Sequence, residues 1–100
     1  MGAFTLTQKA NSDLKGIAAH TQRRWGRQQR KLYAKQFDDA FRMLADTPKA
    51  GNNCDFIKRG YRKFPNGSHV IFYRELSDSN IEIVRILHKH MDVLGRLGDT

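Results

Sequence analysis

The sequence predicts an α+β fold, in the order β-α-α-β-β-β, with a helical hairpin packed on one face of a small, mainly antiparallel sheet. Apolar residues recur at spacings of three and four through the first half of the chain, which is the period of a helix. In the second half they form short runs separated by turn residues, which is typical of strands. The length of 100 residues, 39% of them apolar, suits one domain over 1–100 with a single core at about 3–92. We expect the segment 93–100 to be flexible or to contact a partner.

A short strand is expected at residues 3–7, because Phe4 and Leu6 alternate with smaller side chains in "AFTLT". From Gln8 the period becomes helical, and the hydroxyl of Thr7 can cap the start of this first helix. Its predicted apolar stripe contains Ala10, Leu14, Ile17, Ala18, Thr21 and Trp25.

A second helix follows with almost no linker, because Gly26 is a natural left-handed stop after Trp25. It is expected to end at Thr47, since Pro48 disfavours helical geometry in its predecessor. Its stripe contains Tyr33, Phe37, Ala40 and Leu44. The two helices therefore form an antiparallel hairpin. The spacing of Trp25 predicts that it fills the core between helix and sheet, while the tip of the hairpin gathers Arg23, Arg24, Arg27, Arg30 and Lys31.

Three strands are expected after the loop "PKAGNN", at residues 56–64, 69–76 and 81–88. The turn "PNG" joins the first two, because Asn-Gly accepts the positive φ of a tight hairpin. The last strand carries apolar side chains on both faces, which indicates a central strand. Strict alternation places Ile81, Ile83 and Leu87 on one face and Val84 and Ile86 on the other.

The net charge of +8 is unevenly distributed, with eight Lys/Arg against one Asp in residues 1–37 and four more cations in "KRGYRK" at 58–63. This polarity favours an anionic partner, either nucleic acid or an acidic protein segment. A single cysteine, Cys54, excludes an internal disulfide and fits a reducing compartment. No apolar run approaches the length of a membrane span, so we expect a cytoplasmic protein without membrane contact.

The segment "IVRILHKHMD" at 83–92 raises the question of chemistry at the end of the last strand. His88 and His90 are too few ligands for zinc without a third partner at familiar spacing, so neither a metal nor a cofactor is expected. A nucleolytic site is the stronger chemical alternative. His88 would act as acid or base, while Arg62 and Arg85, on strands that could be neighbours, would hold a phosphate.

A structural interpretation of the same residues stands beside the nucleolytic one. Tyr61 and Tyr73, which could stack a base, would instead fill the edge of the core. Arg85 would pair with Glu82 or Asp92 rather than with phosphate. For the tyrosines the structural interpretation is favoured, and for Arg62 and Arg85 the two remain open.

Several motifs taken together resemble the ParE toxins of the RelE/ParE superfamily. They are "A..DL..IA..T..RWG" in the first helix, "GYR…HVIFYR" across the predicted hairpin and the terminal "RILH..MD". The resemblance extends from Phe4 to about Asp92 and implies a RelE/ParE-like fold of the same β-α-α-β-β-β order. It also implies a toxin of a type II toxin–antitoxin system that inhibits DNA gyrase by binding rather than by catalysis.

The resemblance further implies a cognate ParD-type antitoxin that neutralises the toxin in a hetero-oligomer, with DNA contacted only through the antitoxin or gyrase. The alternative from the RelE branch is a ribosome-dependent mRNA endoribonuclease, in which the working residues would be His88, Arg62 and Arg85. The expected partner-binding residues are Arg23, Arg24, Arg27, Lys58, Arg59, Arg62, Lys63, Arg85, His88 and Met91.

Overall fold

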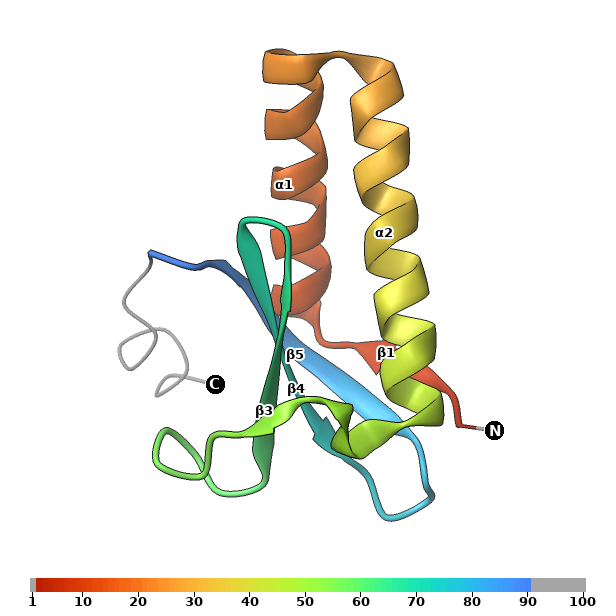
Figure 1. The fold of residues 1–100 in the computed structure, drawn as a ribbon, viewed down its shortest axis with the longest axis vertical. Coiled ribbons are helices and arrows are strands. Elements are labelled where there is room, and N and C mark those ends of the chain that lie inside the picture. The colour runs from red at the N-terminus through yellow and green to blue at the C-terminus, as the bar shows by residue number, and fades with distance from the viewer. Residues whose placement is uncertain (1, 91–100) are drawn as a thin grey trace.

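The computed structural model describes residues 2–90, in which a long helical hairpin covers one face of a twisted five-stranded sheet (Figure 1). The elements are β1 (Phe4–Leu6), α1 (Gln8–Trp25), α2 (Arg27–Asp46), a 3₁₀ turn η1 (Pro48–Ala50), β2 (Asn52–Asn53), β3 (Tyr61–Asn66), β4 (His69–Glu75) and β5 (Ile81–His88). The strand order is β1-β5-β4-β3-β2, and only the β1–β5 pair is parallel. The predicted fold class is confirmed, and β5 is a central strand. No helix in residues 2–90 has the length and apolar character needed to cross a membrane.

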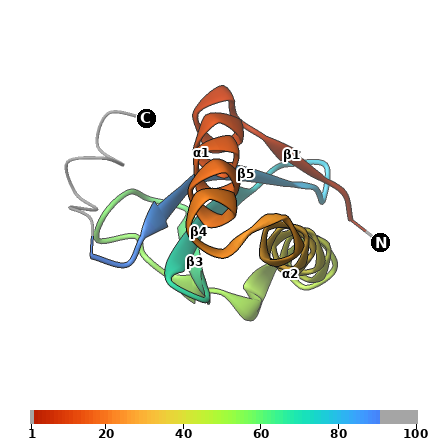
Figure 2. The same ribbon diagram turned by 90° about the horizontal axis from the view of Figure 1, so that it is seen from above.

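The two ends of α1 are set by the residues that the sequence indicated. The Thr7 hydroxyl accepts a hydrogen bond from the Ala10 amide at 3.0 Å and so satisfies one free N–H of the first turn. Gly26 follows Trp25 with φ +93°, a conformation that side chains other than glycine rarely adopt. The same glycine ends α1 and precedes α2, which explains the sharp reversal at the tip of the hairpin (Figure 2).

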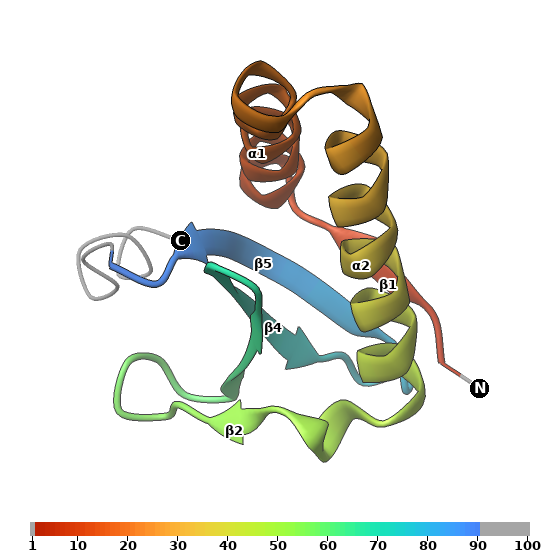
Figure 3. The same ribbon diagram turned by 45° about the horizontal axis from the view of Figure 1, so that its top comes forward.

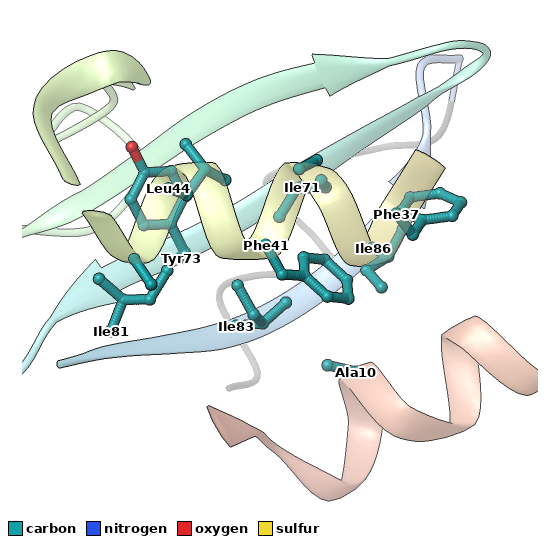
Figure 4. Close-up of a cluster of buried hydrophobic side chains, with 11 residues drawn as sticks. Ala10, Phe37, Phe41, Leu44, Ile71, Tyr73, Ile81, Ile83 and Ile86 are labelled. Carbon is teal, nitrogen blue, oxygen red and sulfur yellow. The ribbon is translucent and has the colours of Figure 1, made fainter. Parts of the chain in front are cut away.

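The main core lies between α2 and the sheet, where their side chains point toward one another (Figure 4). Phe37, Phe41 and Leu44 come from α2 and are at most 2% exposed. Ala10 is the buried residue that α1 contributes to this cluster, and its small side chain leaves room for α1 to lie close to the sheet. A second cluster covers the opposite face of the sheet and consists of Cys54, Tyr61, Phe72, Val84 and Leu87.

The edge of β5 that faces away from β4 is bonded partly by the strand β1 and partly by side chains at the start of α1. β1 pairs only with Ile81, Glu82 and Ile83, so the rest of this edge needs other partners. The Thr7 hydroxyl donates to the Val84 carbonyl at 2.8 Å, and the Asp13 carboxylate accepts from the Ile86 amide at 3.0 Å. Side chains of the cap and first turns of α1 therefore continue the hydrogen bonding that β1 begins.

Asp13 also holds Arg85 through a two-pronged ion pair. The Asp13 oxygens accept from Arg85 Nε at 2.8 Å and from Nη2 at 3.0 Å. The two side chains are only 17% and 12% exposed, so solvent screens the pair weakly. The predicted pairing of Arg85 with Glu82 is wrong, because the Glu82 carboxylate accepts from Arg74 at 2.9 Å instead. The other predicted partner, Asp92, lies outside the described residues.

The second predicted strand, at 56–64, is wrong in its first half. The strand begins only at Tyr61, because the preceding residues form a turn closed by Asp55, whose carboxylate accepts from the Gly60 amide at 2.7 Å. At its other end β3 runs through Asn66, and the tight loop is Gly67-Ser68, with Gly67 at φ +61°. The loop expected at 48–53 contains η1 and the short edge strand β2.

Two residues of β5, Ile86 and Leu87, lie on the opposite faces from those predicted, because a β-bulge interrupts the pairing of β5 with β4. Phe72 pairs with Arg85 and Tyr73 with Ile83, which leaves Val84 as the extra residue. Beyond the bulge the alternation shifts by one residue. Ile86 therefore joins Ile81 and Ile83 under the helices, while Leu87 joins Val84 on the opposite face.

The expected core position of Trp25 is also wrong, since its side chain is 64% exposed. Its spacing places it on the stripe of α1, but the hairpin extends beyond the sheet, and its tip has no strand beneath it (Figures 1 and 3). A large aromatic side chain thus stands on the surface beside the arginines of the tip.

Replacing Asp13 should destabilise the protein far more than replacing an exposed aspartate. Asp13→Ala leaves the partly buried Arg85 guanidinium and the Ile86 amide without their acceptor, which should lower the free energy of unfolding by about 3 kcal/mol. Urea unfolding followed by circular dichroism measures the change.

The matched control is Asp39→Ala, which breaks an exposed pair of Asp39 with Lys35 at 2.8 Å on α2. The control should change the free energy of unfolding by less than about 0.5 kcal/mol. Equal effects of the two substitutions would contradict the role assigned to Asp13.

Candidate functional site

The predicted partner-binding residues fall into three separate regions of the surface. The hairpin tip carries Arg23, Arg24 and Arg27, all exposed. The β3 region, which we define as the turn before β3 together with the start of that strand, carries Lys58, Arg59, Arg62 and Lys63. The end of β5 carries Arg85 and His88. Met91 lies outside the described residues. No single surface therefore contains all of the predicted residues.

Arg62 supports the local structure more than it offers a free charge. Its guanidinium donates to the Gly51 carbonyl at 2.9 Å. The Gly51 amide in turn donates to the Tyr73 hydroxyl at 2.9 Å, and that hydroxyl donates to the Pro48 carbonyl. Arg62 therefore fastens the segment between η1 and β2 onto the sheet.

The three residues of the predicted nucleolytic site are not brought together. β4 lies between β3 and β5, so Arg62 and Arg85 are not on neighbouring strands. Arg85 is also occupied by Asp13. Tyr61 and Tyr73 are 7% and 0% exposed, as the structural interpretation expects, and neither presents a ring for stacking a base.

His88 instead belongs to a cluster of histidines that the sequence did not reveal. Its ring lies 5.5 Å from that of His69, its direct partner across the β4–β5 pair, and 5.2 Å from that of His90. Tyr33 of α2 contacts the cluster through its hydroxyl, 2.7 Å from His69 Nδ1. A correct register for the last two strands would have predicted the His69–His88 contact, but nothing local predicts the approach of Tyr33.

Burial shifts two pKa values in this cluster. The pKa of His69 is lowered, first by its burial and then by the nearby His88 and His20. Burial raises the pKa of the Tyr33 hydroxyl, which remains a neutral hydrogen-bonding group. His69 is thus a neutral imidazole near pH 7, able to donate with one nitrogen and accept with the other.

Two neighbouring cavities meet at the histidines. The first, of about 350 Å³, lies between the hairpin and the β3–β4 turn, and the second, of about 450 Å³, lies along α1 and β5. His20, His69 and His88 line both. Across residues 2–90, no three His, Cys, Asp or Glu side chains are arranged to hold a metal ion.

Cys54 offers no reactive thiol at this site. It is 0% exposed and belongs to the cluster on the opposite face of the sheet. Burial raises the pKa of its thiol, which keeps it protonated and poorly nucleophilic.

Residues 4–93 match the family described as "ParE toxin of type II toxin-antitoxin system, parDE". The chain belongs to the ParE toxin family. It is similar to Toxin ParE1 of Mycobacterium tuberculosis, with 39% identity over 90% of this chain and 92% of the relative. It is also similar to Toxin ParE1 of Caulobacter vibrioides, with 35% identity over 98% of this chain and 100% of the relative.

A solved structure described as "Chromosomal ParDE TA system from P. aeruginosa" has the same fold. It superposes with a TM-score of 0.73 and 21% identity, covering 88% of this chain and 96% of that one. At that identity the likeness concerns the fold alone. The ParE architecture, with its hairpin and central β5, is thus the scaffold that presents the basic regions and the histidine cluster.

The half-buried His69 should make this ParE-family protein less stable in mild acid. Its folded-state pKa is lowered from 6.5, so the unfolded chain binds the proton more readily. The contribution of neutral His69 to the free energy of unfolding is therefore fully present above about pH 6.5, and it is lost as the pH falls through the pKa of the folded state. In NMR titrations, the His69 Cε1–H should titrate below 6.5 in the native protein and near 6.5 in urea.

A native titration above 6.5 would contradict the lowered pKa. As a second readout, His69→Gln should lose less stability than the wild type between about pH 7.5 and about pH 5.5, because Gln has no proton to gain.

Proposed function

We propose that this protein is the toxin of a type II toxin–antitoxin pair, that it inhibits DNA gyrase by binding, and that a ParD-type antitoxin neutralises it. The match of residues 4–93 to the ParE toxin family carries the proposal. The net charge of +8 agrees with it, because antitoxin segments that fold on binding can supply a complementary negative charge.

The inhibition requires binding and no chemistry from this chain. A bound protein shifts the cycle of an enzyme when it has different affinities for two of its states. The two arginines that a nuclease would need for holding phosphate are already engaged within the fold, which supports binding without catalysis. Arg62 donates to the Gly51 carbonyl, and Arg85 is paired with Asp13. Among the predicted partner-binding residues that the structure describes, the exposed side chains are those of the hairpin tip and of Arg59.

The hairpin tip is the strongest candidate for the contact with a partner. Arg23, Arg24 and Arg27 are exposed there beside Trp25, and the Arg24 guanidinium lies 5.4 Å from the centre of the Trp25 ring. Tryptophan and arginine are the residues most often found at the energetic centre of interfaces. The tip therefore combines an aromatic anchor with three cations.

Removing the three cations of the tip should weaken gyrase inhibition without unfolding the protein. In a plasmid supercoiling assay, Arg23→Gln/Arg24→Gln/Arg27→Gln should need at least about tenfold more toxin than the wild type for half-inhibition. The control, Lys15→Gln/Lys35→Gln/Lys49→Gln, removes the same charge from exposed positions outside the predicted set. Unaltered gyrase activity at saturating wild-type toxin would refute inhibition itself, and equal loss in both variants would refute the assignment to the tip.

The complex with the antitoxin should resist salt. If buried apolar contact dominates the affinity, raising the salt from about 0.1 M to about 1 M should screen the exposed charges and weaken the complex only partly. Calorimetric titration at the two concentrations measures this. A complex abolished at moderate salt would show that charge alone holds the partners together.

The mRNA endoribonuclease remains the second candidate, because His69 and His88 lie side by side with their ring centres 5.5 Å apart. Primer extension on cellular messages after toxin induction distinguishes the two functions. Codon-phased cuts that disappear with His88→Ala would favour cleavage, whereas intact messages together with a DNA-damage response would favour gyrase.

A further inference from the structure

The cavity between the hairpin and the β3–β4 turn has a lining suited to an anion. Its walls come from α1, α2, the β3–β4 turn, β4 and β5, and none of its lining residues is a carboxylate. Donors and cations predominate among them, including His20, Arg24, Trp25, Tyr33, His69 and His88. Its volume of about 350 Å³ is within the range of small-ligand sites.

Hydrogen bonds hold both central histidines at their Nδ1 atoms. The Tyr33 hydroxyl lies 3.1 Å from the Asn66 carbonyl and 2.7 Å from His69 Nδ1, and the donor in the second contact depends on the tautomer of His69. The His90 amide donates to His88 Nδ1 at 3.2 Å, so the proton of neutral His88 is on Nε2. The Nε2 atom of neutral His88 is therefore a hydrogen-bond donor.

Trp25 and Arg24 complete the arrangement at the mouth of the cavity. The indole is 64% exposed although it lines the cavity, so much of its surface is free to contact a flat ligand. The neighbouring Arg24 guanidinium supplies a permanent positive charge, 5.4 Å from the centre of the indole ring. An aromatic surface beside a cation is the combination that proteins use to stack a base and hold its phosphate.

We propose that this cavity binds a nucleoside phosphate unit. Arg24 and His88 Nε2–H hold the phosphate, His69 Nε2 pairs with a sugar hydroxyl, which can donate or accept, and the base stacks on Trp25. The unit is either a free nucleotide or one residue of a single strand. The adjoining cavity of about 450 Å³, which shares His20, His69 and His88, has room for a second unit. This binding does not depend on inhibition of gyrase.

The single tryptophan of the chain makes a direct test possible, because all of its tryptophan fluorescence comes from Trp25. The purified full chain is titrated with thymidine 5′-monophosphate, thymidine, inorganic phosphate and a tetrathymidylate. The monophosphate should change the fluorescence saturably, and thymidine and inorganic phosphate should each bind at least about tenfold more weakly. Absence of a saturable change with both the monophosphate and the tetrathymidylate would overturn the proposal.

The same titration distinguishes the two sources of the ligand. Binding of the tetrathymidylate at least about tenfold tighter than the monophosphate would assign the site to a nucleic-acid strand occupying both cavities. Equal affinities would assign it to a free nucleotide. Either ligand should shift the His88 Cε1–H resonance, which reports contact inside the cavity independently of Trp25.

A pair of matched variants separates a site from general attraction to a basic protein. Arg24→Gln should weaken monophosphate binding by about tenfold, while Lys15→Gln, which removes the same charge from an exposed position of α1 outside the lining, should leave it unchanged. Both substitutions are on the surface, and circular dichroism checks that each variant folds. Equal weakening by the two substitutions would overturn the proposal.

Discussion

The arrangement of this fold depends on how the backbone hydrogen-bonding groups on the β1 side of β5 find partners. A central strand has hydrogen-bonding groups on both edges, and a buried group left without a partner is costly. β1 covers only the first three residues of that edge. Thr7, the N-cap of α1, and Asp13, in α1, supply two further bonds along this edge, to the Val84 carbonyl and the Ile86 amide. A helix thus takes over where a strand ends.

This contact determines where the functional surfaces lie. Because Asp13 is fixed against Arg85 and the backbone of β5, the direction of α1 relative to the sheet is fixed as well. Gly26 then turns the chain back, and the packing of Phe37 and Phe41 against the sheet holds α2 in place. The tip of the hairpin consequently projects beyond the sheet, as Figure 3 shows. Its aromatic and cationic side chains are exposed there.

Charge has two different roles in this ParE-family protein. Arg62 and Arg85 are partly buried, and their guanidinium groups donate to the Gly51 carbonyl and to the Asp13 carboxylate within the fold. The arginines of the hairpin tip are exposed and lie next to the exposed Trp25. Partly buried cations of this kind say little about function because they are bonded within the fold, whereas the exposed arginines of the tip are accessible to a partner.

The sequence by itself determined the order and type of the main elements, the cap at Thr7, the stop at Gly26 and the central position of β5, because these follow from the periodicity and backbone preferences of neighbouring residues. Only the tertiary structure decided three other features. The bulge exchanged the faces of Ile86 and Leu87, Arg85 found a partner 72 residues away, and His20 of α1 came to line the same cavities as His69 and His88. Each depends on strand register or on the packing of distant segments, and no local pattern encodes either. The exposure of Trp25 follows the same rule, since periodicity gives the side of a helix but not how far the sheet extends beneath it.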